Sequence, residues 1–159
     1  MINRLTTKFS EKLDGVARIL FMAMMLLVVA NVVSRSLGYP FHGASEWVGF
    51  LMACAIALAL SYCAAQGGHV AVTILFEKLS NRKQVIAELI VNILVFIFLI
   101  LVVRMMILYG IRLDEGGHVG MTSRVPLHYF AYVIAVGIAG YSAVVLGEII
   151  ELFKKVGKR

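Results

Sequence analysis

The stretch "VIAELIVNILVFIFLILVVRMMILY", residues 85–109, carries only two charged side chains, Glu88 and Arg104, in an otherwise apolar run. At a rise of 1.5 Å per residue, a helix of this length exceeds the roughly 30 Å of a bilayer's hydrocarbon core. A run of this length and composition is typical of a transmembrane helix. This stretch is therefore expected to lie within a membrane.

Three further stretches are long and apolar enough to span, namely Val16–Leu37, Ala44–Ala65 and Leu127–Gly147. Hydrophobic residues make up 61% of the 159-residue chain, and its mean hydropathy is +0.92, above the usual values for a soluble domain. The first stretch is longer than the apolar part of a signal peptide, and no A-x-A-like cleavage site follows it. We predict an all-α integral membrane protein, one domain over residues 1–159 with four transmembrane helices.

The distribution of lysine and arginine predicts the orientation of these helices. Cytoplasmic segments of membrane proteins are enriched in both residues. Eleven of the fifteen basic residues fall on one side: Arg4, Lys8, Lys12, Arg18, Lys78, Arg82, Lys83, Lys154, Lys155, Lys158 and Arg159. Both termini are therefore expected in the cytoplasm, with residues 148–159 as a basic tail. The net charge of +6 fits attraction to anionic lipid headgroups and requires no nucleic-acid partner.

Two shorter segments have the pattern of helices lying in the membrane interface. Residues 1–15 place apolar side chains at helical spacing among basic ones, which predicts an amphipathic lead-in on the cytoplasmic surface. Between the second and third spans, "GGHVAVTILFEKLS" (67–80) is too short to cross a bilayer. On a helix over 69–80, one face carries Val72, Leu75, Phe76 and Leu79, while His69 lies on the polar face.

Charged residues near the outer ends of the first two spans could pair across a short connection. Arg35 ends the first span and Glu46 begins the second, so a structural ion pair between them is expected. A contact of either residue with a partner subunit is the alternative.

Two rows of small residues recur every four positions along the second and fourth spans. The rows are Gly49, Ala53, Ala57, Ser61 and Ala65, and Ala131, Ala135, Ala139, Ala143 and Gly147. Small residues at this spacing allow helices to approach closely in a membrane. Either the two rows pack within this chain, or at least one of them packs against another membrane subunit.

The residue types that catalysis or cofactor binding requires are not grouped in this sequence. Cys54 and Cys63 lie roughly 13 Å apart on a helix, too far for a disulfide. The four histidines are scattered over both sides of the membrane, which excludes a shared metal site. Both prolines lie at helix ends, so no span shows the interruption typical of transporter binding sites. We expect no enzyme activity, no cofactor and no complete transport pathway in this chain alone.

An ordered set of residues gives a resemblance to a known family. The set runs from Arg35 through "GYP" (38–40), Glu46 and a small-rich helix to "GGHVAV" (67–72), Leu75 and "EKLS" (77–80), and closes with "TSRVP" (122–126). In this order the chain resembles the DctQ-type small permease subunit of tripartite ATP-independent periplasmic (TRAP) transporters. The resemblance covers essentially the whole chain.

The resemblance implies a bacterial inner-membrane protein that works with two partners. One is a large permease subunit coupled to an ion, usually sodium, and the other is a periplasmic binding protein that captures an organic acid such as a C4-dicarboxylate, sialic acid or a sugar acid. The small subunit would brace the large one and help dock the binding protein. Mapped onto this chain, the docking surface would comprise Phe41, His42, Arg112, Asp114, Glu115, His118 and Arg124.

A small four-helix exporter that acts alone as a homo-oligomer is the alternative from another class. Such a protein would need a titratable carboxylate in mid-span, and the sequence places none there.

Overall fold

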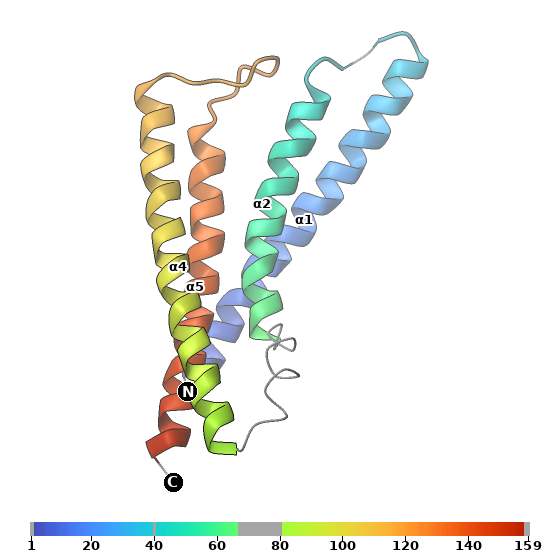
Figure 1. The fold of residues 1–159 in the computed structure, drawn as a ribbon. Helices are drawn as coiled ribbons and strands as arrows, with labels where there is room; N and C mark the ends of the chain where they lie inside the picture. Colours follow the sequence, from blue (N-terminus) through green and yellow to red (C-terminus); the bar gives the residue numbers. More distant parts are fainter. Residues whose placement is uncertain (1, 40, 67–80, 158–159) are drawn as a thin grey trace.

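The computed structural model describes residues 2–39, 41–66 and 81–157 of the chain, and their regular structure is almost entirely helical (Figure 1). The helices are α1 (Ile2–Ser36), α2 (Ala44–Ala65), α4 (Asn81–Glu115) and α5 (His128–Gly157). All four contain segments long and apolar enough to cross a membrane. The predicted all-α class with four membrane-spanning helices is therefore confirmed at this level.

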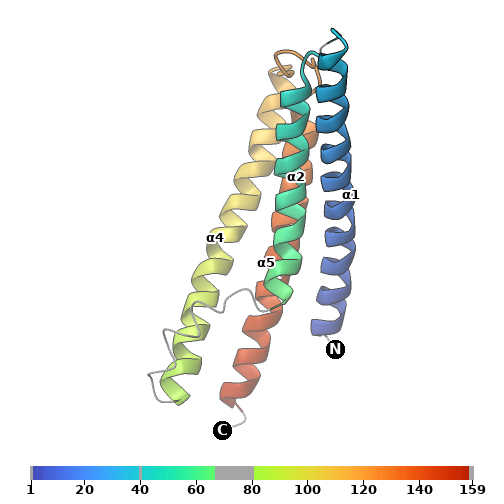
Figure 2. The same cartoon turned by 90° about the vertical axis from the view of Figure 1, so that its right-hand side faces the viewer.

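The helices form two antiparallel hairpins, α1–α2 and α4–α5, with α2 and α5 in the middle (Figure 2). Among the described helices, α4 packs against α5 alone, whereas α1 also contacts the lower part of α5. The flanking helices α1 and α4 therefore leave most of their surface uncovered. In water such surface would be unfavourable, whereas lipid or another membrane subunit can cover it.

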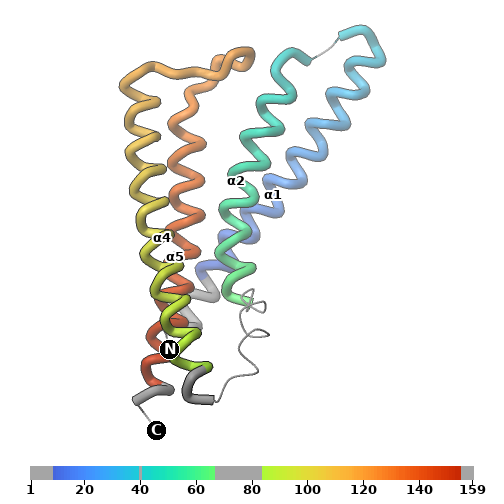
Figure 3. The backbone as a smooth tube through the Cα atoms, in the orientation of Figure 1, coloured from blue at the N-terminus to red at the C-terminus, as the bar shows by residue number. Residues whose placement is uncertain are grey.

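Because neighbouring helices are antiparallel, the connections between the helices of each hairpin lie at the same end of the bundle. The connection between α1 and α2, of which 37–39 and 41–43 are described, and the connection 116–127 lie at one end of the bundle, which we call the outer end. Helix α1 begins and α5 ends at the other (Figure 3). Toward the outer end the axes of α2 and α5 diverge (Figure 1). The two hairpins are thus close in the middle of the bundle and further apart where the connections lie.

Helix α2 has the predicted bounds, but the other helices extend beyond their apolar segments. Helix α1 runs without interruption from Ile2 to Ser36, through the residues expected as a separate lead-in. The lead-in is therefore continuous with the helix of the first span. Its position on the cytoplasmic surface stays a prediction. The predicted interfacial helix at 69–80, with His69, Val72, Leu75, Phe76 and Leu79, lies outside the described residues.

Close packing of α2 on α5 depends on a glycine inside the fourth span. A Cβ atom at Gly137 would lie 2.5 Å from the carbonyl oxygen of Ala57, so the two backbones meet with no room for a side chain. One turn further, a Cβ at Gly140 would lie 2.7 Å from Leu13 on α1 and 3.4 Å from the Cβ of Ser61 on α2. Three helices therefore converge around Gly140, where Ser61 is fully buried.

The two rows of small residues lie only partly in this contact. Ala57 and Ser61 of α2 are buried, whereas Gly49 and Ala53 are exposed where the helices diverge. On α5, Ala131, Ala135 and Gly147 are buried, Ala139 is half-buried and Ala143 is exposed. Each row thus packs within the chain over part of its length and leaves the rest uncovered.

Candidate functional site

Both outer connections leave their preceding helix through the same backbone motif. At the end of α1, the N–H of Tyr39 bonds to the carbonyl of Ser34 at 3.0 Å, with Gly38 at a φ of 84°. At the end of α4, the N–H of His118 bonds to the carbonyl of Leu113 at 3.0 Å, with Gly117 at a φ of 59°. This Schellman arrangement satisfies the last carbonyls of a helix and sends the chain sideways. Both connections therefore cross the outer end instead of continuing along the helix axes.

The connection 116–127, which we call the outer loop, folds into a small hairpin. Val119 and Pro126 pair as an antiparallel bridge, and the N–H of Gly120 bonds to the carbonyl of Val125 at 2.9 Å. The N–H of Arg124 returns to the carbonyl of Gly120 at 3.1 Å, with Arg124 in a left-handed conformation at a φ of 52°. These bonds satisfy backbone groups within the loop and give it a defined shape.

The tip of the outer loop is tied to α2 by the carboxylate of Glu46. The N–H of Ser123 donates to Oε2 at 2.8 Å, and the N–H of Thr122 lies 3.2 Å from both carboxylate oxygens. Hydrogen bonds from backbone N–H groups to an ionised acceptor are about twice as strong as neutral ones. Because Glu46 sits in the first turn of α2, the contact connects the outer loop of the α4–α5 hairpin to the outer end of the α1–α2 hairpin.

Two glycines allow the loop to approach this carboxylate. A Cβ at Gly120 would lie 2.9 Å from Oε2 of Glu46 and 2.5 Å from Oγ of Ser123. A Cβ at Gly43, the residue before α2, would lie 3.4 Å from Cγ2 of Thr122, and Gly43 has a φ of 91°. The loop, the carboxylate and the start of α2 are therefore packed as one unit.

The predicted ion pair between Arg35 and Glu46 is not formed. Both residues lie in the described ranges, and no ion pair joins Arg35 to Glu46 there, whereas Asp14 pairs with Arg18 one turn further along α1. The physical reason is that the carboxylate is turned toward the outer loop, where two backbone N–H groups satisfy it. Arg35 is exposed at the end of α1.

The outer loop is held at its base by a second contact. Asp114 Oδ1 lies 3.3 Å from Nδ1 of His128, so the end of α4 contacts the first residue of α5. The ring of His128 also lies 4.1 Å, between centroids, from that of Tyr129. Asp114, predicted to face a binding protein, is thus engaged within the chain although its side chain remains 64% exposed.

Aromatic side chains fill the space between α2 and α5 just below the loop. Phe50 and Phe130 stack with ring centroids 4.4 Å apart, and Trp47 meets Phe130 edge-on at 6.2 Å. Offset-stacked and edge-to-face geometries are the favourable ones for aromatic pairs. Glu46, in the turn above Phe50, is therefore supported from below by a packed aromatic cluster.

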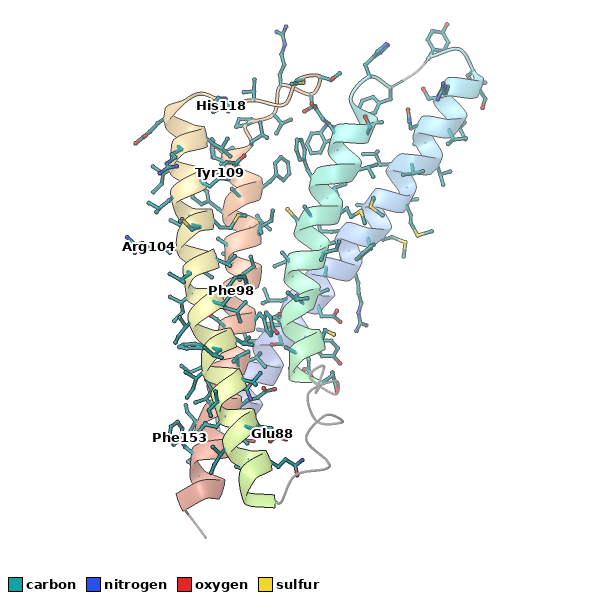
Figure 4. The ribbon with its side chains drawn as sticks, in the orientation of Figure 1. Glu88, Phe98, Arg104, Tyr109, His118 and Phe153 are labelled. Carbon is teal, nitrogen blue, oxygen red and sulfur yellow. The ribbon has the colours of Figure 1, made fainter. Side chains whose placement is uncertain are left out.

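The other residues predicted to face a binding protein are exposed at the outer end, where Figure 4 places His118 above the top of α4. They are Phe41, His42, Arg112, Glu115, His118 and Arg124. Exposed apolar side chains that the sequence did not single out lie among them, with Met121 at 98% and Tyr39 at 80% exposure. The surface is therefore mixed, with apolar side chains between charged ones, a composition common in protein interfaces.

Arg104 is placed differently from these residues. It lies on α4 well below the outer loop and points away from the bundle (Figure 4). It is exposed among apolar side chains such as Leu101 and Met105. A long cationic side chain at such a position can extend its charge toward the membrane interface.

The sequence reasoning missed two kinds of functional residue at this site and beneath it. Gly137 and Gly140 allow close contacts between helices, and glycines within an apolar span were the available signal. The amide groups of Thr122 and Ser123 left no signal, because any residue supplies a backbone N–H. Over the residues with assigned positions, no group of three or more metal-ligating side chains occurs.

Comparison with known proteins gives one match. No curated protein and no solved structure matches the chain. A family model described as "Tripartite ATP-independent periplasmic transporters, DctQ component" matches residues 24–155, which include the last third of α1, all of α2, α4 and the outer loop, and nearly all of α5. On this match, the chain belongs to the DctQ family, the small membrane component of tripartite ATP-independent periplasmic transporters.

Proposed function

We propose that this protein is the non-catalytic small subunit of a tripartite secondary transporter for an organic acid, in the inner membrane of a bacterium. It braces the large, ion-coupled permease subunit and helps dock the periplasmic binding protein. The family match over residues 24–155 carries the proposal. Substrates of the C4-dicarboxylate, sialic acid or sugar acid type, and sodium as coupling ion, come from the resemblance described above.

The uncovered faces of α1 and α4 support the bracing role. Both helices expose large apolar side chains along their length, for example Met22 and Leu26 on α1 and Leu94 and Phe98 on α4. Each of these four side chains is more than 60% exposed. A larger membrane subunit can pack against such apolar faces.

Bracing also requires that the small subunit keep its own depth in the bilayer. Displacing a membrane protein along the bilayer normal costs fractions of a kcal/mol per Å through hydrophobic mismatch. We propose that the segment 69–80 adds an interfacial anchor on the cytoplasmic side, so that the subunit opposes movement of an elevator-like neighbour.

Phe76→Asp tests this anchor, because it would place a charge on the apolar face of the proposed interfacial helix. We expect weaker membrane retention in alkaline extraction and reduced uptake. Glu77→Gln, on the polar face, is the matched control and should leave both unchanged. Normal uptake by Phe76→Asp at normal expression would contradict the anchoring role.

The complete proposal is tested by co-expression. The tagged chain is expressed with its genomic neighbours in a transport-deficient bacterium and purified in mild detergent. Recovery of a large multi-spanning permease, together with uptake that requires an added periplasmic binding protein, is the expected result. A homo-oligomer that moves substrate unaided would overturn the proposal in favour of a small exporter.

Charge substitutions on the outer loop test the docking role separately. Arg112→Gln and Arg124→Asn remove exposed charges, and asparagine tolerates the left-handed backbone at position 124. Charges at the rim of an interface mainly affect the association rate and its salt dependence. We expect slower binding-protein association and a smaller salt dependence of that rate. Lys154→Gln, near the opposite end of the molecule, is the control and should change neither; unchanged association in the loop variants would contradict docking at this surface.

A further inference from the structure

The outer ends of the two helical hairpins are joined through few contacts. Helices α2 and α5 meet backbone to backbone at Ala57 and Gly137 and diverge above this point (Figure 1). Above it, the connections between the hairpins include the contacts of Phe50 and Trp47 with Phe130 and the bonds of Glu46 to the outer loop. Of these connections, the Glu46 bonds lie furthest from the contact of Ala57 with Gly137. They therefore restrain relative motion of the two hairpins most effectively.

Glu46 has the properties of a side chain that fixes the position of a neighbouring element. Its two carboxylate oxygens accept from the N–H groups of Thr122 and Ser123, which occupy consecutive positions at the tip of the loop. A bidentate acceptor constrains orientation as well as distance. Gly120 and Gly43 bring the backbone on both sides within van der Waals distance, so the contact is packed as well as hydrogen-bonded.

The two connections on either side of this contact carry exposed apolar side chains. Tyr39 and Phe41 belong to the connection before α2, and Val119 and Met121 belong to the outer loop. The two connections belong to different hairpins. Without the contact they could therefore move relative to each other.

We propose that Glu46 is a positioning residue that ties the outer loop to the α1–α2 hairpin, so that the two connections present one rigid surface to the binding protein. The tie itself rests on the geometry of this chain. Only the identity of the partner rests on the function proposed above.

The tie is tested on the purified full-length chain in lipid nanodiscs, without any partner. Spin labels are attached at Tyr39→Cys and Met121→Cys, two exposed positions on either side of the contact, after Cys54→Ala and Cys63→Ser remove the native thiols. Pulsed electron paramagnetic resonance then measures the distance distribution between the labels. We expect one narrow distribution with Glu46 present and a broader, longer one in Glu46→Gln and Glu46→Ala.

Two further variants keep the test independent of folding. Gly120→Ala attacks the same contact from the loop side, because the added methyl would lie 2.9 Å from the Glu46 carboxylate, and it should broaden the distribution in the same way. Arg35→Gln removes the charge once expected to pair with Glu46 and should leave the distribution unchanged. Unchanged distributions in Glu46→Gln, Glu46→Ala and Gly120→Ala, with helical circular dichroism retained, would overturn the proposal.

The role in docking is measured next on the assembled transporter. We expect Glu46→Gln to weaken binding-protein association about tenfold, equivalent to 1.4 kcal/mol, while the large subunit still co-purifies. Broadened distances with undiminished association would overturn the docking role and leave the tie intact. Loss of co-purification by the unsubstituted chain would instead count against the proposed function.

Discussion

At the scale of single residues, one missing methyl group determines how closely two helices pack. The Cβ of Gly137→Ala would lie 2.5 Å from the Ala57 carbonyl oxygen, a backbone atom that cannot move away cheaply. Overpacking of this kind costs typically about 1–3 kcal/mol. We expect Gly137→Ala to lower the free energy of unfolding by that amount in detergent-induced unfolding followed by circular dichroism.

Gly49→Ala is the matched control for this substitution, since a Cβ at Gly49 meets nothing within 4 Å. In a helix interior alanine is favoured over glycine by roughly 0.5–1 kcal/mol, so this variant should be neutral or slightly more stable. Equal effects of the two substitutions would refute the close contact at Gly137.

Residue-level features of the site were predictable only where they depend on residue type. Glu46 was recognisable as a carboxylate at a helix start with a role near the outer interface. Its partners were not, because the amide groups of Thr122 and Ser123 come from a loop far away in the sequence. Arg35 is the cation closest to Glu46 in the sequence, so an ion pair between them was predicted. In the structure the Glu46 carboxylate instead accepts hydrogen bonds from the outer loop.

At the scale of secondary-structure elements, the pairing of α2 with α5 at the outer end depends on aromatic stacking. Phe50 and Phe130 lie 4.4 Å apart between ring centroids, and such pairs contribute about 0.5–1.5 kcal/mol beyond their buried area. A double-mutant cycle of Phe50→Ala and Phe130→Ala should therefore yield a coupling energy in that range. Pairing Phe50→Ala with Phe98→Ala, an exposed phenylalanine of α4, should yield none.

Comparing the observed helix ends with the ends of the apolar runs shows what a hydropathy pattern can predict about a helix. Helix α2 ends where its apolar run ends, at Ala65, and its bounds match the prediction. Helix α4 begins at Asn81 and ends at Glu115, beyond the apolar run at both ends. Apolar residues report which part of a helix can lie in lipid, whereas backbone hydrogen bonding continues through polar residues until a glycine such as Gly117 ends it.

At the scale of the whole molecule, the two ends of the bundle differ in what they present. The outer end carries two structured connections tied together, and the other end carries the start of α1 and the basic end of α5. From Met121 in the outer loop to Lys154, the chain traverses most of α5, whose 30 residues extend about 45 Å at the helical rise. This exceeds the roughly 30 Å hydrocarbon core, so the two positions should face opposite compartments.

The excess of lysine and arginine at the end opposite the outer loop predicts which compartment each position faces. In a background with Cys54→Ala and Cys63→Ser, Met121→Cys should react with a membrane-impermeant maleimide in intact cells. Lys154→Cys should react only after the inner membrane is permeabilised. The opposite labelling pattern would place the outer loop in the cytoplasm, where no periplasmic binding protein could reach it, and would contradict the docking role and the orientation together.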